Sequence, residues 1–310
     1  MTFPLILLIV AAVCLFLLAA AVLYFFRFAH RRLDNMTNQL LSSDVRLAYR
    51  DMVQNGLAYI GAHECEDVSI TSFDGLQLHG IYLPTENARA TILCFHGYRS
   101  CGLQDFSPMP EFYHSLGLNV LLVDQRACGK SEGKYTTFGI LERRDVVSWA
   151  NYIDERLGGL PILLDGLSMG AASVMLAANL LLPSSIRGII ADCGFTSPWE
   201  IIAHCGKQWF HIPAFPMVHL LSALARLRFG EGYRSCSTLT SLANSNHPLL
   251  LLHGADDDFV PTYMSEQNFE AADGYKRKLI VPGAGHGMSY LVDQKRCQQE
   301  LSNFVDDVLK

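Results

Sequence analysis

The chain has 310 residues, half of them hydrophobic, a formal net charge of −6 and a pI near 6.0. This length accommodates one large α/β domain with an additional segment. The acidic balance, and the lack of a basic block with interleaved aromatic residues in the body of the sequence, argue against a nucleic-acid partner. The nine cysteines are scattered and form no C-x-x-C pair, so their spacing indicates neither a disulfide framework nor a zinc site.

The first predicted element is a long apolar helix. Residues 3–26 read FPLILLIVAAVCLFLLAAAVLYFF and contain no charged side chain. At about 1.5 Å per residue the segment is roughly 36 Å long, enough to cross a hydrocarbon core of about 30 Å. A cleaved secretory signal has its basic region before a shorter apolar core, whereas Arg27, Arg31 and Arg32 follow this one. We predict a retained membrane anchor with a basic flank at 1–32, and the flank favours a body on the cytoplasmic side.

Residues 33–65 are predicted to form a linker with a packing helix. N-cap candidates at 42–44 precede apolar residues that recur on one helical face. The next stretch, DVSITSFDGLQLHGIYLP (67–84), alternates apolar and polar residues on both sides of Asp74 and Gly75. Because Asp-Gly is a favoured hairpin turn, we predict a β-hairpin here.

After the hairpin, short apolar strands alternate with helices. The predicted strands are 90–97, 119–126, 161–166, 186–193, 248–254 and 276–283, and the predicted helices are 110–116, 140–156, 171–182 and 261–272. This alternation predicts an α/β fold with a mainly parallel sheet and helices on both faces. Functional side chains are then expected at the carboxyl ends of the strands.

An insertion at about 198–246 interrupts the alternation. It is too long for a simple crossover, and its first part, PWEIIAHCGKQWFHIPAF, is rich in aromatic residues and histidine. We predict a small helical lid over the strand ends. The alternative is a longer pair of surface helices.

The segment GLSMG (166–170) lies between a predicted buried strand and an alanine-rich helix. Glycine two residues on either side of Ser168 gives the backbone freedom that a strand turning directly into a helix needs. G-x-S-x-G in this position is typical of a nucleophile elbow, in which the serine hydroxyl points out of a strained turn. The alternative is a plain strand-to-helix turn.

Two other predicted strand ends carry the groups that such a serine needs. A serine hydroxyl becomes a good nucleophile only beside a base that an acid orients. The strand at 248–254 is followed by Asp256, Asp257 and Asp258, and the strand at 276–283 is followed by His286. The chain order Ser, Asp, His differs from that of the chymotrypsin and subtilisin types and is the order of α/β-hydrolases.

Residues 68–310 resemble the α/β-hydrolase fold superfamily, and within it the membrane-anchored or secreted bacterial serine hydrolases of the esterase/acyl-peptidase-like kind. The motifs that carry the resemblance are FHGYRS, LLVDQRACGKSEGKYTTFG, GLSMGA, HGADDDFVP and GAGHG. The resemblance implies an α/β-hydrolase domain at 66–310, with the lid inserted and the transmembrane helix preceding it.

In such families the acid lies four residues beyond the histidine of a His-Gly pair, which from His253 selects Asp257. Its neighbours Asp256 and Asp258 are then solvated or support the turn, and we predict no calcium site because no second ligand cluster accompanies them. Asp192, at the end of the strand at 186–193, is the alternative acid. His253 itself is predicted to be structural.

The resemblance also implies an oxyanion hole built from two backbone amides. One is that of Met169, directly after the nucleophile, and the other is that of Tyr98, in the loop after the strand at 90–97. His96 is predicted to shape this loop rather than to act as a second base. Ser131 lies in a second G-x-S-x-G, GKSEG, which lacks a following apolar helix and is therefore predicted to be a turn.

Together these residues predict a serine esterase in which Ser168 is acylated, His286 is the base and Asp257 orients it. The substrate would be a small-molecule carboxylic ester with an apolar or small acyl group, and no metal or organic cofactor is required. A peptidase or thioesterase using the same residues is one alternative. A non-catalytic, membrane-tethered binding protein on the same scaffold is another.

Overall fold

The structure, a computed structural model, describes residues 3–32 and 48–310. Within them, eight strands form one sheet in the order β1-β2-β4-β3-β5-β6-β7-β8. Only the pairs β1–β2 and β2–β4 are antiparallel, so the predicted mainly parallel sheet is confirmed. The strands are β1 (Glu66–Thr71), β2 (Gln77–Leu83), β3 (Ala90–Phe95), β4 (Leu118–Val123), β5 (Ile162–Leu167), β6 (Ile186–Asp192), β7 (Leu249–Gly254) and β8 (Lys276–Val281).

β1 and β2 form the predicted hairpin. Thr71 pairs with Gln77, and Gly75 between them has a φ of +89°, the left-handed conformation that glycine adopts without strain. Every residue of β3, β4 and β7 is buried. These strands read as continuous apolar runs because helices cover both faces of the sheet.

Side chains of successive strand residues enter two cores on opposite faces of the sheet. In β3, Leu93 and Phe95 contribute to one core, while Ile92 and Cys94 contribute to the other. The first face is covered by α6 (Glu142–Arg156), α7 (Met169–Ala177), α10 (Thr238–Ala243) and α11 (Thr262–Ala271). The second face is covered by α3 (Arg50–Ala62), α4 (Gly102–Phe106), α5 (Pro110–Ser115), α12 (Ser289–Val292) and α13 (Gln294–Val308).

The predicted helices appear with shifted ends, and the largest difference is in α7. The prediction was 171–182, whereas the helix runs from Met169 to Ala177. It ends earlier because Leu180 and Leu182 pack on the core from the turn that follows. The carboxyl-terminal helix α13 was not predicted. The part of the predicted packing helix before residue 48 lies outside the described residues.

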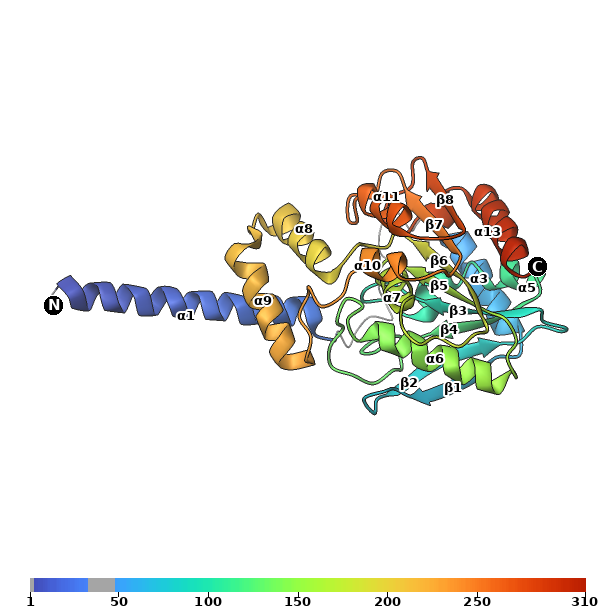
Figure 1. Cartoon of the computed structure of the whole chain (residues 1–310), viewed down its shortest axis with the longest axis horizontal. Helices are drawn as coiled ribbons and strands as arrows, with labels where there is room; N and C mark the ends of the chain where they lie inside the picture. Colours follow the sequence, from blue (N-terminus) through green and yellow to red (C-terminus); the bar gives the residue numbers. More distant parts are fainter. Residues whose placement is uncertain (1–2, 33–47) are drawn as a thin grey trace.

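A third apolar core joins the amino-terminal helix to the lid. α1 (Phe3–His30) projects from the body, and α8 (Pro198–Phe210) and α9 (Ala214–Phe229) lie where it meets the body (Figure 1). The amino-terminal half of α1 is exposed, but Val22, Phe26 and His30 are buried at four-residue spacing, which puts them on one helical face. α10, in the same insertion, instead packs on α7 and α11. The name lid is kept below for α8 and α9, which pack on each other and, through α9, on α1.

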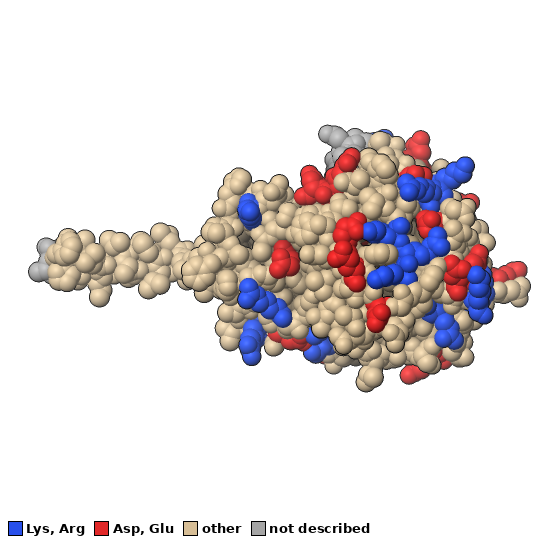
Figure 2. Space-filling model, turned by 45° about the horizontal axis from the view of Figure 1, so that its top comes forward, with Lys and Arg blue, Asp and Glu red and all other residues tan. Residues whose placement is uncertain are grey.

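The body and the projecting part of α1 differ in charge. Figure 2 shows Lys, Arg, Asp and Glu side chains spread over the body and none on the projecting part of α1. α1 is also the one helix among the described residues that is long and apolar enough to cross a membrane. Length and composition alone do not separate such a helix from a signal sequence.

Candidate active site

Ser168 occupies a strained turn between β5 and α7. Its φ of 54° and ψ of −111° lie outside the regions that ordinary residues adopt. The Ser168 amide donates to the carbonyl of Asp192 on the neighbouring strand, 2.8 Å away, which fixes the turn against β6. The predicted elbow geometry is therefore present at the carboxyl end of β5.

The two glycines of the elbow are required by close backbone contacts. A Cβ on Gly166 would lie 2.4 Å from the backbone of Gly170, and a Cβ on Gly170 would lie 1.8 Å from the carbonyl oxygen of Phe95. Since real Cβ atoms do not approach so closely, only glycine lets α7 begin against the end of β3. The same contact places the loop after β3 beside Ser168.

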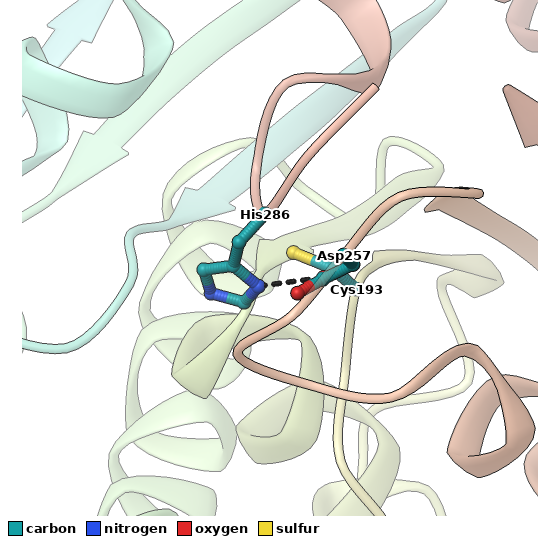
Figure 3. Close-up of side chains that lie close together, drawn as sticks. All are labelled: Cys193, Asp257 and His286. Carbon is teal, nitrogen blue, oxygen red and sulfur yellow. Dashed lines mark hydrogen bonds and ion pairs between the residues drawn. The ribbon is translucent and has the colours of Figure 1, made fainter. Parts of the chain in front are cut away.

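His286 connects Ser168 to Asp257 by two hydrogen bonds. Its Nε2 lies 2.8 Å from Ser168 Oγ, and its Nδ1 lies 2.7 Å from Asp257 Oδ2 (Figure 3 shows the second contact). A carboxylate only accepts, so Nδ1–H donates to Asp257 and Nε2 is left to accept the serine hydroxyl proton. Three side chains from the ends of β5, β7 and β8 thus form one hydrogen-bonded chain.

Asp257 is held in its ionised form by its surroundings. Its side chain is fully buried, and its Oδ1 accepts hydrogen bonds from the amides of Phe259 and Val260, both at 2.9 Å. Burial alone would raise the Asp257 pKa, but the contacts from His253 and His286 and the Val260 amide lower it well below its usual value. An ionised acid can accept the hydrogen on Nδ1 of His286 and so orient the imidazole.

His253 is a second imidazole in contact with the Asp257 carboxylate. Its Nε2 lies 3.1 Å from Asp257 Oδ2 and 2.8 Å from the carbonyl of Val260, and its Nδ1 lies 2.6 Å from Ser265 Oγ. Because a carbonyl accepts, Nε2 carries a hydrogen, and in the neutral imidazole Nδ1 then accepts from the serine hydroxyl. The sequence marked His253 only as structural, and no spacing rule showed that it would contact Asp257.

Asp192, the alternative acid, is engaged elsewhere. Its Oδ1 accepts from Ser289 Oγ at 2.9 Å, and burial raises its pKa. Among the described residues, the carboxylate that hydrogen-bonds to His286 is that of Asp257. Asp256 and Asp258 are exposed, as expected for solvated neighbours of the acid.

A buried thiol lies beside this pair. The ligand atoms of Cys193, Asp257 and His286 lie within 4.8 Å of one another (Figure 3). Three such atoms could in principle hold a metal ion, but Asp257 and His286 are already bonded to each other, and burial raises the Cys193 pKa well above its ordinary value. A metal prefers the thiolate, so this donor set does not fit a metal centre.

The two predicted oxyanion donors belong to segments next to Ser168. A Cβ on Gly97 would lie 3.4 Å from the Ser168 Cβ, so the loop that carries Tyr98 touches the serine. Met169 begins α7, and the amides of a first helical turn have no partner inside the helix. Within residues 3–32 and 48–310, no protein acceptor pairs with the amide of Tyr98 or of Met169.

Two other residues that the sequence analysis singled out, His96 and Ser131, form hydrogen bonds between loops and strands, and Arg126, in the same loop as Ser131, forms ion pairs. His96 Nε2 accepts from the Gln125 amide at 2.9 Å, and Ser131 Oγ donates to the carbonyl of Asp124 and accepts from the His79 amide. Arg126 forms ion pairs with Asp74 and Asp145. These contacts hold the loop after β4 to the loop after β3, to the β1–β2 hairpin and to α6.

One side chain at the site was missed in the sequence. The Phe259 ring stacks on the His286 imidazole with centroids 4.7 Å apart and also contacts the Trp209 ring of α8 at 4.7 Å. It follows the acidic run Asp256–Asp258 directly, but only the fold brings it over His286.

A mostly parallel sheet with a serine elbow and a hydrogen-bonded histidine at its carboxyl edge is the architecture of an α/β hydrolase. Residues 92–297 match the model of the alpha/beta hydrolase family. The chain belongs to this family.

Similar proteins agree with this assignment. The chain is 28% identical over 240 residues to the uncharacterized protein YqkD of Bacillus subtilis, covering 77% of this chain and 78% of that protein. It is 29% identical over 228 residues to the uncharacterized protein YfhR of Escherichia coli K12, covering 71% of this chain and 73% of that protein. The esterase Pf2001 of Pyrococcus furiosus superposes with a TM-score of 0.64 at 24% identity, covering 80% of this chain and 93% of that one. At that identity the likeness shows the fold.

Proposed function

We propose that the protein is a serine esterase that cleaves carboxylic esters through an acyl-enzyme. The observation that carries this proposal is the pair of hydrogen bonds from His286, to Ser168 at 2.8 Å and to Asp257 at 2.7 Å. Both contacts are within the reach that general-base activation of a serine requires. Esterases among the similar folds also support it.

In the first step Ser168 Oγ attacks the ester carbonyl while its proton passes to His286 Nε2. The amides of Tyr98 and Met169 stabilise the oxyanion of the tetrahedral intermediate. When that intermediate collapses, the leaving alkoxide takes the proton from Nε2 and departs as the alcohol, and the acyl group remains on Ser168.

In the second step water attacks the acyl carbonyl and gives its proton to Nε2. Collapse of the second intermediate breaks the bond to Ser168 Oγ, which takes that proton back, and the carboxylic acid is released. Asp257 stays ionised throughout and stabilises the imidazolium formed in each half of the reaction.

The decisive experiment compares the serines of the two G-x-S-x-G segments. In the full chain, Ser168→Ala is expected to lower kcat for p-nitrophenyl butyrate by on the order of 10⁴-fold or more. Ser131→Ala, which removes a structural hydroxyl, is expected to keep the activity within a few-fold. Hydrolysis by Ser168→Ala at the wild-type rate would refute the proposal.

The leaving group is tested in the same assay. A serine acyl-enzyme forms from an ester, a thioester or an amide, so matched butyryl substrates of each kind are compared at equal concentration. We expect the ester to be cleaved with the highest kcat/KM. A higher kcat/KM for the amide or the thioester would instead identify a peptidase or a thioesterase.

We also propose that α1 is retained and crosses a membrane, with the body on the cytoplasmic side. Burial of Val22, Phe26 and His30 in the folded protein supports retention, because a cleaved leader does not contribute to the core of the mature protein. The arginines at 27, 31 and 32 support the orientation. The body is expected to be digested by protease in inside-out vesicles and protected in right-side-out vesicles.

A further inference from the structure

An apolar pocket opens between α1 and the two lid helices. Its wall on the α1 side consists of Phe25, Phe28 and Ala29, and Trp209 and Phe210 are among the residues of α8 on the opposite side. The rings of Phe25 and Phe28 contact the Phe210 ring edge-on, with centroids 5.2 Å and 5.7 Å apart. Such a lining suits a hydrocarbon chain.

Two residues that line this pocket are neighbours of the proposed catalytic residues. Phe259 lines the pocket and stacks on the His286 imidazole at 4.7 Å. Tyr98 also lines it, and the amide of this residue is the second proposed oxyanion donor. An acyl chain lying in the pocket would therefore place its carboxyl end beside Ser168.

α1 is fastened to the loop that carries this donor. The Tyr98 hydroxyl donates to the carbonyl of Ala29 at 2.6 Å, and the Arg99 guanidinium donates to the carbonyl of Phe28. Burial raises the Tyr98 pKa to about 12, so the hydroxyl keeps its proton near neutral pH. These bonds satisfy carbonyls that the end of a helix leaves unpaired.

The buried face of α1 prevents the helix from sliding. His30 Nε2 lies 2.6 Å from the Tyr233 hydroxyl and its Nδ1 lies 2.6 Å from the carbonyl of Thr136. The Phe26 ring stacks on Phe229 of α9 with centroids 5.6 Å apart. The last turns of α1 are thus part of the folded body.

This docking sets the distance between the body and a bilayer. About 19 residues of α1 precede the buried Val22, and at about 1.5 Å per residue they measure roughly 28 Å, close to a hydrocarbon core of about 30 Å. The body must then lie directly on the membrane surface. Trp209, Phe210 and Phe215 of the lid are exposed, and the two helices that carry them lie where α1 meets the body (Figure 1).

We propose that the last two turns of α1 form one wall of the acyl-binding pocket, and that the substrate is a long-chain lipid ester whose acyl chain enters this pocket directly from the bilayer. The inference rests on the proposed esterase function and names the substrate class of that site. The anchor then selects the substrate as well as holding the enzyme at the membrane.

The test fills the pocket from each of its two sides in the full chain, reconstituted in phosphatidylcholine vesicles. Ala29→Phe adds a ring from α1, and Gly206→Leu adds a side chain from α8, where a Cβ meets no atom closer than 3.8 Å. The control is Leu23→Phe, on an exposed part of α1 outside the pocket lining. Two substrates are compared: monooleoylglycerol in the vesicles and p-nitrophenyl butyrate in the water.

Wild type is expected to cleave both esters, with the higher kcat/KM for monooleoylglycerol. Both pocket variants should lower the oleoyl-to-butyryl ratio of kcat/KM by about tenfold or more, and Leu23→Phe should leave that ratio within about twofold of wild type. Rates are divided by the concentration of serine that a small fluorophosphonate labels, so misfolded protein does not count. A pocket variant that fails to label is replaced by a smaller substitution, such as Ala29→Leu.

A ratio that falls in Gly206→Leu but not in Ala29→Phe would overturn the role of α1. Cleavage of the butyryl ester alone by wild type would overturn the lipid substrate and leave the esterase proposal standing. Cleavage of neither ester would refute the esterase proposal, and this inference with it.

Discussion

The carboxyl edge of the sheet and the junction of α1 with the lid are built from different interactions. At the sheet edge, polar side chains come from the ends of separate strands and are hydrogen-bonded to one another, as with Ser168, His286, Asp257 and His253. At the junction, aromatic and aliphatic side chains pack together. His30 is a polar side chain among them and hydrogen-bonds to the Thr136 carbonyl and the Tyr233 hydroxyl.

This difference matches the two tasks that we propose for the protein, acyl transfer at the sheet edge and substrate selection at the junction. Hydrogen bonds between strand ends fix directions, and acyl transfer depends on direction because a small misplacement of the base lowers the rate. Apolar contacts between helices are less directional. We therefore expect polar substitutions at the edge to change catalysis and substitutions at the junction to change which substrate is used.

The largest effect is expected when the acid of the sheet edge is changed. Asp257→Asn should lower kcat on the order of 10⁴-fold, because an amide no longer stabilises the imidazolium and can favour the wrong tautomer of His286. Asp192→Asn, which alters a buried acid that hydrogen-bonds to Ser289, should lower kcat by less than about tenfold. Steady-state kinetics on p-nitrophenyl butyrate measures both. The reverse ranking would show that Asp192 is the functional acid.

A second prediction concerns how the buried carboxyl of Asp165 makes the folding stability depend on pH. Burial raises the pKa of Asp165 in β5 to about 7, although Tyr113 donates a hydrogen bond to it. The unfolded chain ionises this acid from about pH 4 upward and the folded chain only near pH 7, so folding stability should fall across that interval. At about 1.4 kcal/mol per pKa unit the fall is at most about 4 kcal/mol.

Asp165→Asn removes this ionisation. Denaturant unfolding in detergent micelles at pH 4.5 and pH 7.5 should show that the variant gains stability relative to wild type as the pH rises. A difference between the two proteins that does not change with pH would contradict the raised pKa of Asp165.

A third prediction tests the close backbone contact of the elbow. Gly170→Ala places a Cβ 1.8 Å from the Phe95 carbonyl and should lower the free energy of unfolding by about 3 kcal/mol. Gly61→Ala is the matched control in α3, because a Cβ there meets nothing within 4 Å. It should leave stability unchanged or raise it by up to about 1 kcal/mol. Equal stability of the two variants would show that α7 does not begin against β3.

The smallest effect is expected at the junction. His30→Ala leaves the Tyr233 hydroxyl and the Thr136 carbonyl without their partner, which should lower the local opening free energy by about 1–3 kcal/mol. Hydrogen exchange should then rise in the last turns of α1 and in α8 and α9, and stay unchanged in β5 and β6. His219→Ala, on the exposed surface of α9, is the control. Unchanged exchange near α1 would show that His30 does not fasten it.

Much of the sheet edge was predictable from the sequence because its signals are local. Gly166 and Gly170 flank Ser168 within five residues, and the acid and the histidine each follow an apolar run that reads as a strand. Parallel strands bring their carboxyl ends to one edge, so strand order was not needed to expect the three side chains together. Their convergence at hydrogen-bond distance is what the structure adds.

The junction was much less predictable. The segment at 3–26 is apolar on every side, so its composition hides the face carrying Val22 and Phe26 that packs on the body. Phe259 gave no signal either, because its position over His286 depends on how distant segments meet. His253 served only to locate Asp257 four residues further on, and its contact with that carboxylate was not predicted. α13 was missed although its apolar residues recur at helical spacing, on a polar background, from Cys297 to Val305.

The central claim is that His286 and Asp257 make Ser168 nucleophilic, and a fluorophosphonate probe tests it most directly. Attack by Ser168 Oγ forms an oxygen–phosphorus bond and expels fluoride, and the modified peptide identifies the residue by mass spectrometry. We predict labelling of Ser168 in the wild-type chain, loss of labelling in folded His286→Ala, and no label on Ser131. Equal labelling of Ser168 with and without His286, or no labelling of Ser168 in the wild type, would contradict the account.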